Sequence, residues 1–115
     1  MPEVECQLTH HSVEDAIECA RKTLKLAKAD EVPMWGTKEN KLANKGNVIG
    51  FKDRANHRRW RLDYDPGKGL HVNEEDFTAE ESRKVCHKIS TVFGGEIIMY
   101  QWWHKWSAAG TAGYD

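Results

Sequence analysis

Apolar residues recur with a helical period near the N-terminus. Between Ser12 and Ala29 they return every three or four positions, while charged residues fill the opposite face. Ser12 and Asp15 have the spacing of a capping box, in which side chains bind the free backbone N–H groups of the first turn. The pattern predicts an amphipathic helix over residues 12–29, preceded by an extended segment over residues 1–11.

The middle of the chain alternates apolar and polar residues with a period of two. Residues 30–46 show no period and contain glycine, proline and asparagine, which predicts a long surface connection. Three segments bounded by turn-forming residues then predict an antiparallel meander, namely Asn47–Lys52, His57–Tyr64 and Leu70–Asn73. Arg59 and Arg61 alternate with apolar residues, so we expect both arginines on one face of the sheet.

The last third of the chain predicts a second helix and a further strand. Thr78 and Glu81 have capping-box spacing, and apolar residues continue at helical spacing until Gly94. Glu96–Trp103 is rich in β-branched and aromatic residues, which favours a strand. We therefore expect a single α+β domain over residues 1–115, with one or more N-terminal helices packed on a small antiparallel β-sheet.

The composition is typical of a folded domain of mixed surface charge. The 115 residues include 17 Lys+Arg and 18 Asp+Glu, and 5 Trp, 3 Tyr and 3 Phe oppose disorder. No apolar run approaches the roughly 20 residues that a membrane span needs, and we expect no signal peptide at this N-terminus. Cys6, Cys19 and Cys86 lack paired spacing, which favours reduced thiols over a disulfide framework.

Charge is segregated along the chain although the total is nearly neutral. A basic stretch over residues 45–61 precedes an acidic stretch over residues 74–81. A basic hairpin with interleaved rings can hold a phosphate backbone while the rings stack on bases. This interpretation predicts RNA contacts from Lys52, Arg58, Arg59, Trp60 and Tyr64. The alternative is a solvated hairpin that pairs with the acidic stretch.

The segment Arg61–Asn73 carries the candidate acid–base chemistry. Its turn brings two strand ends side by side, so we expect the polar side chains to converge. Histidine exchanges a proton near neutral pH, and a cationic side chain can stabilise the phosphorane of RNA transphosphorylation. The candidate catalytic residues are Arg61, Asp63, Lys68, His71 and Asn73. The alternative is that these polar groups only satisfy the hydrogen bonds of the hairpin.

In the catalytic interpretation each residue has a role. His71 is the general acid or base, Arg61 and Lys68 hold the scissile phosphate, and Asp63 orients His71 or an arginine. Asn73 or Tyr64 positions the ribose or the base. Metal and cofactor chemistry have weaker support, because the cysteines and His10, His11 and His87 lack zinc-ligand spacing. We expect exposed histidines, buried free thiols, no metal site and no cofactor.

The same segment resembles a signature of bacterial polymorphic toxins. The run Arg-x-Asp-x-Asp-Pro-x-x-Gly-x-His-x-Asn, here Arg61–Asn73, is frequent in C-terminal toxin domains of contact-dependent inhibition, Rhs and WapA-like proteins. The predicted order of helix and meander is similar to the ribonuclease fold of barnase, EndoU and RelE. The resemblance implies a toxin, delivered from another cell, that cleaves RNA, often transfer RNA, in the cytoplasm without a metal. It also implies a cognate immunity protein as partner, and it favours Arg61, Asp63, His71 and Asn73 as site residues.

The function that we expect is therefore that of a metal-independent endoribonuclease toxin. Three alternatives stay open at this point. One is a noncatalytic nucleic-acid-binding module that uses the same arginines. Another is a protein-interaction module, such as an immunity or adaptor protein, that uses the acidic stretch from Glu74 to Glu81. The third is a metal-dependent DNase.

Overall fold

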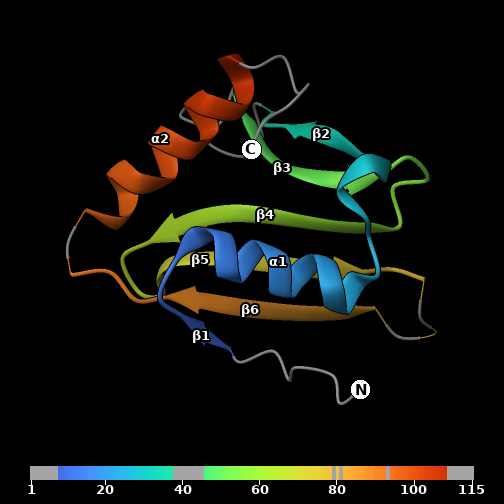
Figure 1. Ribbon diagram of the computed structural model, residues 1–115, viewed down its shortest axis with the longest axis horizontal. Coiled ribbons are helices and arrows are strands. Elements are labelled where there is room, and N and C mark those ends of the chain that lie inside the picture. The colour runs from blue at the N-terminus through green and yellow to red at the C-terminus, as the bar shows by residue number, and fades with distance from the viewer. Residues whose placement is uncertain (1–7, 38–45, 79, 81, 93, 109–115) are drawn as a thin grey trace.

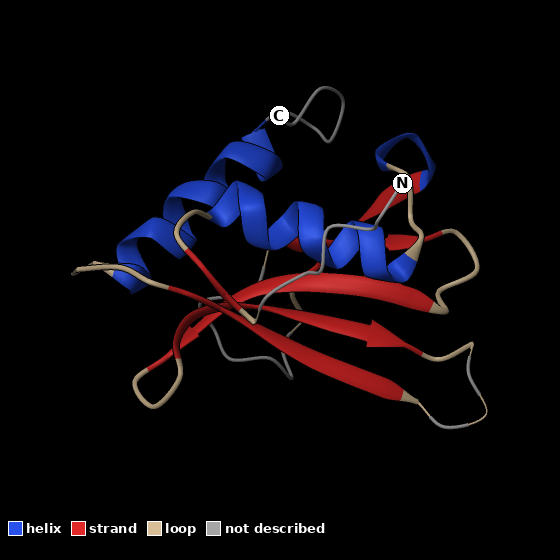
Figure 2. Ribbon diagram, turned by 60° about the horizontal axis from the view of Figure 1, so that its bottom comes forward, coloured by secondary structure: helices blue, strands red, loops and turns tan. Residues whose placement is uncertain are grey.

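Two helices lie on one face of a six-stranded sheet (Figure 1). The computed structural model describes residues 8–37, 46–78, 80, 82–92 and 94–108. Figure 2 shows both helices on the same side of the strongly twisted strands. The opposite side of the sheet is called the outer face below.

The sheet has the strand order β1-β6-β5-β4-β3-β2. Its central strands form antiparallel pairs, and β1 pairs with β6 in parallel. The strands are β1 Thr9–His10, β2 Glu31–Trp35, β3 Val48–Asp53, β4 Arg58–Asp65, β5 Gly69–Asp76 and β6 Arg83–Ile89. The helices are α1 Val13–Leu24, a short 3-10 turn at Lys28–Asp30 and α2 Gly95–Ala108.

The first helix begins where the sequence predicts it. The Ser12 side chain accepts a hydrogen bond from the Asp15 backbone N–H at 3.1 Å, so the predicted N-terminal cap is confirmed. The helix ends at Leu24, however, and not near Ala29 as predicted. Lys25 adopts a left-handed backbone conformation with φ 55°, which closes the last turn and redirects the chain toward β2.

The predicted meander is confirmed as β3, β4 and β5. The prediction of a long surface connection over residues 30–46 is partly wrong. Within that connection, Glu31–Trp35 forms the edge strand β2 on β3. Residues 38–45 of the connection lie outside the described residues. Pro33 hides this strand in the sequence, because a proline is typical of loops and is tolerated in a strand mainly at the edge of a sheet.

The last two predicted elements are wrong, because helix and strand are exchanged. The segment predicted as a helix contains β6, in which alternate residues such as His87 and Ile89 are buried while Lys88 is exposed. The segment predicted as a strand is α2, whose buried residues Met99, Trp103 and Trp106 recur at helical spacing. Packing of these rings on the sheet overrides their local preference for strands.

The predicted arrangement of the fold is therefore corrected, although its α+β class is right. The barnase/EndoU/RelE-like arrangement places N-terminal helices on an antiparallel sheet. Here the sheet is mixed, and one of its two helices is C-terminal. The difference follows from the exchange above, since β6 extends the sheet beyond β5 and α2 covers β3 and β4.

Tryptophan rings fill the space between the helices and the sheet. Trp60 of β4 and Trp106 of α2 meet edge to face, with ring centroids 5.5 Å apart. Two of the buried indole N–H groups have acceptors within the fold. The Trp103 N–H donates to the Leu62 carbonyl at 2.9 Å, and the Trp60 N–H donates to Glu31 Oε2 at 2.6 Å.

Arg58 connects the β3–β4 turn to the end of α1. Its Nη1 donates to the carbonyls of Leu24 and Lys25 at 3.1 and 3.0 Å, and its Nε donates to Asp53 Oδ2 at 3.2 Å. Asp53 Oδ1 also accepts the backbone N–H of His57 at 2.7 Å. Burial raises the pKa of the Asp53 carboxyl, but the hydrogen bonds from Arg58 and His57 outweigh it and bring the pKa below 3.8.

We expect Asp53→Asn to lower stability by about 1–3 kcal/mol at neutral pH, because it weakens this charged acceptor. A carboxyl whose pKa is lower in the folded state stabilises the fold above its unfolded pKa, and the gain disappears as the pH falls through the folded pKa. Urea unfolding of both proteins at neutral pH and well below pH 3.8 checks this. A deficit that is equal at the two pH values would contradict the assignment.

Candidate nucleic-acid interface

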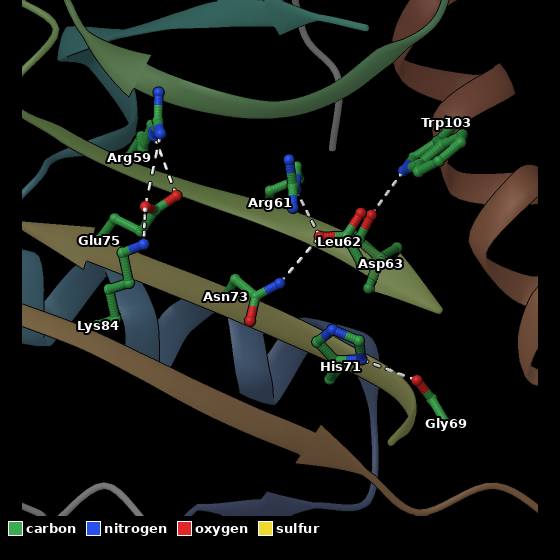
Figure 3. A network of polar contacts seen from close by, with 10 residues as sticks. All are labelled: Arg59, Arg61, Leu62, Asp63, Gly69, His71, Asn73, Glu75, Lys84 and Trp103. Atoms are coloured by element: carbon green, nitrogen blue, oxygen red, sulfur yellow. Dashed lines mark hydrogen bonds and ion pairs between the residues drawn. The ribbon is translucent and has the colours of Figure 1, made fainter. Parts of the chain in front are cut away.

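A polar network on the outer face joins Arg61, Asp63 and Asn73 of the β4–β5 hairpin, and His71 lies beside it (Figure 3). The strand register pairs Arg61 with Asn73 and Asp63 with His71. Because side chains alternate along a strand, these four point away from the helices while Leu62 and Val72 point into the core. The predicted placement on one face is confirmed for Arg61, Asp63, His71 and Asn73, and Arg59 lies on the same face as Arg61, but the predicted convergence of Lys68 with them is wrong.

Asp63 is the centre of this network. Its Oδ2 accepts a hydrogen bond from Arg61 Nε at 2.5 Å and another from Asn73 Nδ2 at 2.9 Å. The carboxylate therefore fixes the orientation of both neighbours. The Arg61 side chain is 33% exposed, so the guanidinium is held by Asp63 through Nε and is still accessible to solvent.

His71 is oriented by the backbone and not by the Asp63 carboxylate. Its Nδ1 lies 2.8 Å from the Gly69 carbonyl oxygen, which only accepts, so Nδ1 carries the proton. A neutral His71 ring then has its lone pair on Nε2, which bonds to no described residue. The residue is only 2% exposed, which leaves a partner little access to the ring.

A second group on the outer face pairs two basic side chains with one carboxylate. Glu75 accepts a hydrogen bond from Arg59 Nε at 3.1 Å and forms an ion pair with Lys84 Nζ at 3.7 Å. The Arg59 guanidinium also lies over the Phe77 ring, 5.0 Å from its centroid. Contacts with a carboxylate and with an aromatic ring therefore hold the Arg59 side chain in place.

The residues predicted to contact RNA divide between the two faces. Lys52 and Arg59 pair in register on the outer face. Arg58 donates a hydrogen bond to the Leu24 carbonyl at the end of α1, and Trp60 is fully buried in the core. Tyr64 packs against the same core, beside Gly95 of α2. Base stacking by Trp60 would therefore require the core to open.

Lys68 lies apart from the network in the β4–β5 turn. Its side chain is exposed, and its backbone N–H donates to Asp65 Oδ1 at 2.6 Å. This hydrogen bond lowers the pKa of Asp65, and attraction by His71 and Lys68 adds to the effect. The turn thus holds a carboxylate and a lysine next to the strand that carries His71.

The acidic stretch does not form one continuous surface. Glu74 is buried on the covered side of β5, whereas Glu75 belongs to the outer face. Asp76 accepts hydrogen bonds from the backbone and the hydroxyl of Thr78. The hydrogen bond from the Thr78 hydroxyl lowers the pKa of Asp76 most, and the Thr78 backbone N–H adds to this effect, which partial burial opposes. Glu81 lies outside the described residues.

A buried cluster that the sequence did not predict lies between α1 and the β1–β6 edge of the sheet. It consists of His10, Cys19 and His87, whose potential ligand atoms lie within 4.8 Å of one another. The expectation of exposed histidines is wrong for His10 and His87, which are 9% and 2% exposed. The signal that could have found His87 is the period-two pattern of β6, which places it beside buried Ile89.

The prediction of reduced thiols is corrected in one case. Cys19 is disulfide-bonded, whereas Cys86 is a free thiol on β6. Cys6 lies outside the described residues. Spacing along the chain did not indicate the disulfide, because such a bond depends on which segments the fold brings together.

A cleft of about 350 Å³ lies between the two helices. Trp60, Trp102 and Trp106 contribute apolar walls, and Arg21 and Lys105 contribute charge. The Lys105 ammonium lies over the Trp102 ring, 4.9 Å from its centroid. The cleft is on the covered side of the sheet and shares no residue with the Asp63 network.

Comparisons with known proteins give no family for this chain. No protein-family model matches it, and no curated protein is significantly similar to it. Among the described residues, neither helix combines the length and the apolar character that crossing a membrane requires.

Proposed function

We propose that the outer face of β4 and β5 binds RNA and cleaves it by transphosphorylation without a metal ion. The observation that carries this proposal is the registered placement of Arg61, Asp63, His71 and Asn73 on one face of one hairpin. A cation held by a carboxylate, beside a histidine of fixed tautomer, supplies a phosphate-binding group and a proton acceptor.

His71 is the general base in this proposal. Its Nε2 takes the proton from a ribose 2′-hydroxyl, and the 2′-oxygen forms a bond to the neighbouring phosphorus. The bond from phosphorus to the 5′-oxygen breaks, and that oxygen takes a proton from water. The products are a 2′,3′-cyclic phosphate and a 5′-hydroxyl, and His71 returns its proton to solvent.

Arg61 is the phosphate-binding group. Its Nε is bonded to Asp63, and no described residue bonds to its terminal nitrogens, which can pair with two phosphate oxygens. Asn73 is held by the same carboxylate and positions the ribose. Further basic side chains of the outer face and the adjoining turn can hold neighbouring phosphates, namely Lys52, Arg59, Lys68, Lys84 and Lys88.

The toxin signature supports the remaining part of the proposal. Arg61, Asp63, His71 and Asn73 are also four of the five polar signature positions of the Arg61–Asn73 run that resembles polymorphic toxin domains, the fifth being Asp65. On that basis we propose a toxin delivered from another cell, with RNA, transfer RNA included, as its cytoplasmic substrate. A cognate immunity protein would neutralise it most directly by covering the outer face.

Binding without cleavage is the second candidate, and the burial of His71 favours it. The His71 residue is 2% exposed and offers a substrate little surface, while the Arg61 side chain is 33% exposed. In that case the outer face holds RNA by charge alone, and affinity falls steeply with salt.

The decisive variant is His71→Asn. The asparagine amide can still donate to the Gly69 carbonyl in place of Nδ1, but it removes Nε2. We expect cleavage of total RNA and transfer RNA in EDTA to fall by about 10²–10⁴-fold with binding retained. We expect Arg61→Ala to weaken both cleavage and binding, with a loss of cleavage of about 10²-fold.

Two matched variants and one fold check control this experiment. His104→Ala and Arg54→Ala remove an exposed histidine and an exposed arginine outside the network, and should cleave as the original chain does. Circular dichroism in EDTA verifies that every protein stays folded. Salt-sensitive binding with no cleavage by the unaltered chain would select the second candidate, and absence of both binding and cleavage would reject both.

A further inference from the structure

The His10, Cys19 and His87 cluster brings three side chains of metal-ligating type together in the interior. They come from β1, α1 and β6, which are separate elements of the chain. Buried polar groups in such a position are normally explained by hydrogen bonds or by a bound ion. All three residues are buried, which distinguishes this cluster from the exposed acidic groups that often lie close together on a protein surface without binding a metal.

The two histidines are spaced as ligands of one ion would be. His10 Nε2 and His87 Nδ1 lie 3.2 Å apart. Two nitrogens that each lie about 2.0–2.1 Å from a tetrahedral zinc ion are about 3.3–3.4 Å apart. A small outward shift of either ring therefore brings both lone pairs onto one metal.

Glu74 supplies the outer contact that metal-binding histidines usually have. Its Oε1 lies 2.7 Å from His87 Nε2, and its carboxylate is 1% exposed. The carboxylate accepts a hydrogen bond from His87 Nε2–H. The lone pair of the His87 ring is therefore on Nδ1, the atom that faces His10. Arg83 Nη2 donates to the other oxygen of Glu74 at 3.1 Å and holds it in place.

The same contacts also describe the cluster without a metal. His10 Nε2–H donates to His87 Nδ1, and His87 Nε2–H donates to Glu74. Zinc would take the place of the first of these two protons, which would move from His10 Nε2 to Nδ1 of the same ring, so that the imidazole stays neutral. The second hydrogen bond would persist and become the support of the metal-bound ring.

The state of Cys19 decides whether the third ligand exists. A disulfide sulfur is not a thiolate, and the thiolate is the metal ligand. A dithiol reductant converts the disulfide to two thiols with two electrons and two protons, and becomes a cyclic disulfide itself. Zinc then displaces the proton of the Cys19 thiol to solvent.

We propose that the reduced chain binds one Zn²⁺ through His10, Cys19 and His87, and that formation of the Cys19 disulfide prevents this binding. Two imidazoles and one thiolate are the ligand types that select zinc over magnesium or calcium. The site lies on the covered side of the sheet, opposite the Asp63 network. It is therefore a structural and redox-dependent site, distinct from the proposed cleavage.

Cobalt titration tests the proposal, because Co²⁺ replaces zinc and absorbs light when bound by a thiolate. The full chain is first reduced with a dithiol. Gel filtration under nitrogen then removes the dithiol, and the reduced chain is titrated with Co²⁺. We expect a thiolate-to-cobalt charge-transfer band that saturates at one ion per chain and disappears when Zn²⁺ is added. The chain kept oxidised should give no such band.

Variants assign the band to its ligands. Cys19→Ser should abolish it, whereas the matched variant Cys86→Ser, which removes the free thiol on the outer face, should retain it. Glu74→Gln should weaken metal affinity by about 10–100-fold. Circular dichroism with and without metal reports whether each protein is folded.

Two results would overturn the proposal. The first is a reduced chain of unaltered sequence that gives no charge-transfer band at saturating Co²⁺, whether or not it is folded. The second is a Cys19→Ser protein whose band equals that of the original chain. Neither result bears on RNA cleavage, which depends on the opposite face of β5, so the two proposals fail separately.

Discussion

Glu31→Ala should lower the free energy of unfolding by about 3–5 kcal/mol, the largest loss expected from removing one charged side chain. The Glu31 side chain is 0% exposed and accepts hydrogen bonds from Arg21 Nε and Nη2. It also accepts the Trp60 indole N–H. Alanine would leave a nearly buried guanidinium and a buried N–H without this acceptor.

A neighbouring ion pair gives the matched control for Glu31. Glu18 binds the same Arg21 guanidinium at Nη1, but its side chain is 69% exposed. Glu18→Ala should therefore cost less than about 1 kcal/mol. Urea unfolding followed by tryptophan fluorescence measures both variants. Equal losses would show that burial does not distinguish the two carboxylates.

Gly50→Val should prevent the sheet from forming in its present register. A Cβ atom at Gly50 would lie 2.1 Å from the Trp60 carbonyl oxygen and 2.7 Å from the Arg61 Cα. Both atoms are backbone, so no side-chain rotation relieves the overlap, and β3 must separate from β4. We expect a loss of more than about 4 kcal/mol, seen as absence of a cooperative thermal transition.

Gly67→Ala is the control for this substitution. A Cβ atom there meets only the Asp65 side chain, at 3.3 Å, within the exposed β4–β5 turn. We expect a change of less than about 1 kcal/mol, because the carboxylate can move aside. A Gly50→Val protein that unfolds cooperatively near the temperature of the Gly67→Ala protein would refute the close approach of β3 and β4.

The candidate site was predictable because it is local. Arg61, Asp63, His71 and Asn73 belong to one hairpin, and a tight turn together with alternation fixes which side chains share a face. Which face of the sheet the helices cover, however, depends on packing between distant segments and cannot be predicted from the hairpin alone. For that reason Arg58 and Trp60 were predicted beside Arg59 as RNA contacts, although they lie on the other side of β4.

The remaining errors have the same cause. Aromatic residues of α2 favour a strand by themselves, and only their packing on β3 and β4 selects a helix. The His10–His87 contact joins residues 77 positions apart, through a parallel pairing of β1 with β6. No spacing rule for metal ligands covers such a separation, so the cluster becomes visible only once the sheet order is known.

The two edges of the sheet differ in what they offer to another polypeptide. On one side β1 contributes only Thr9 and His10, which is too short to template a long ladder. On the other side β2 contains Pro33, which has no N–H to donate, and its register with β3 shifts between Met34 and Trp35. Both described edges therefore oppose strand-by-strand aggregation, and recognition of a partner falls to side chains on the faces.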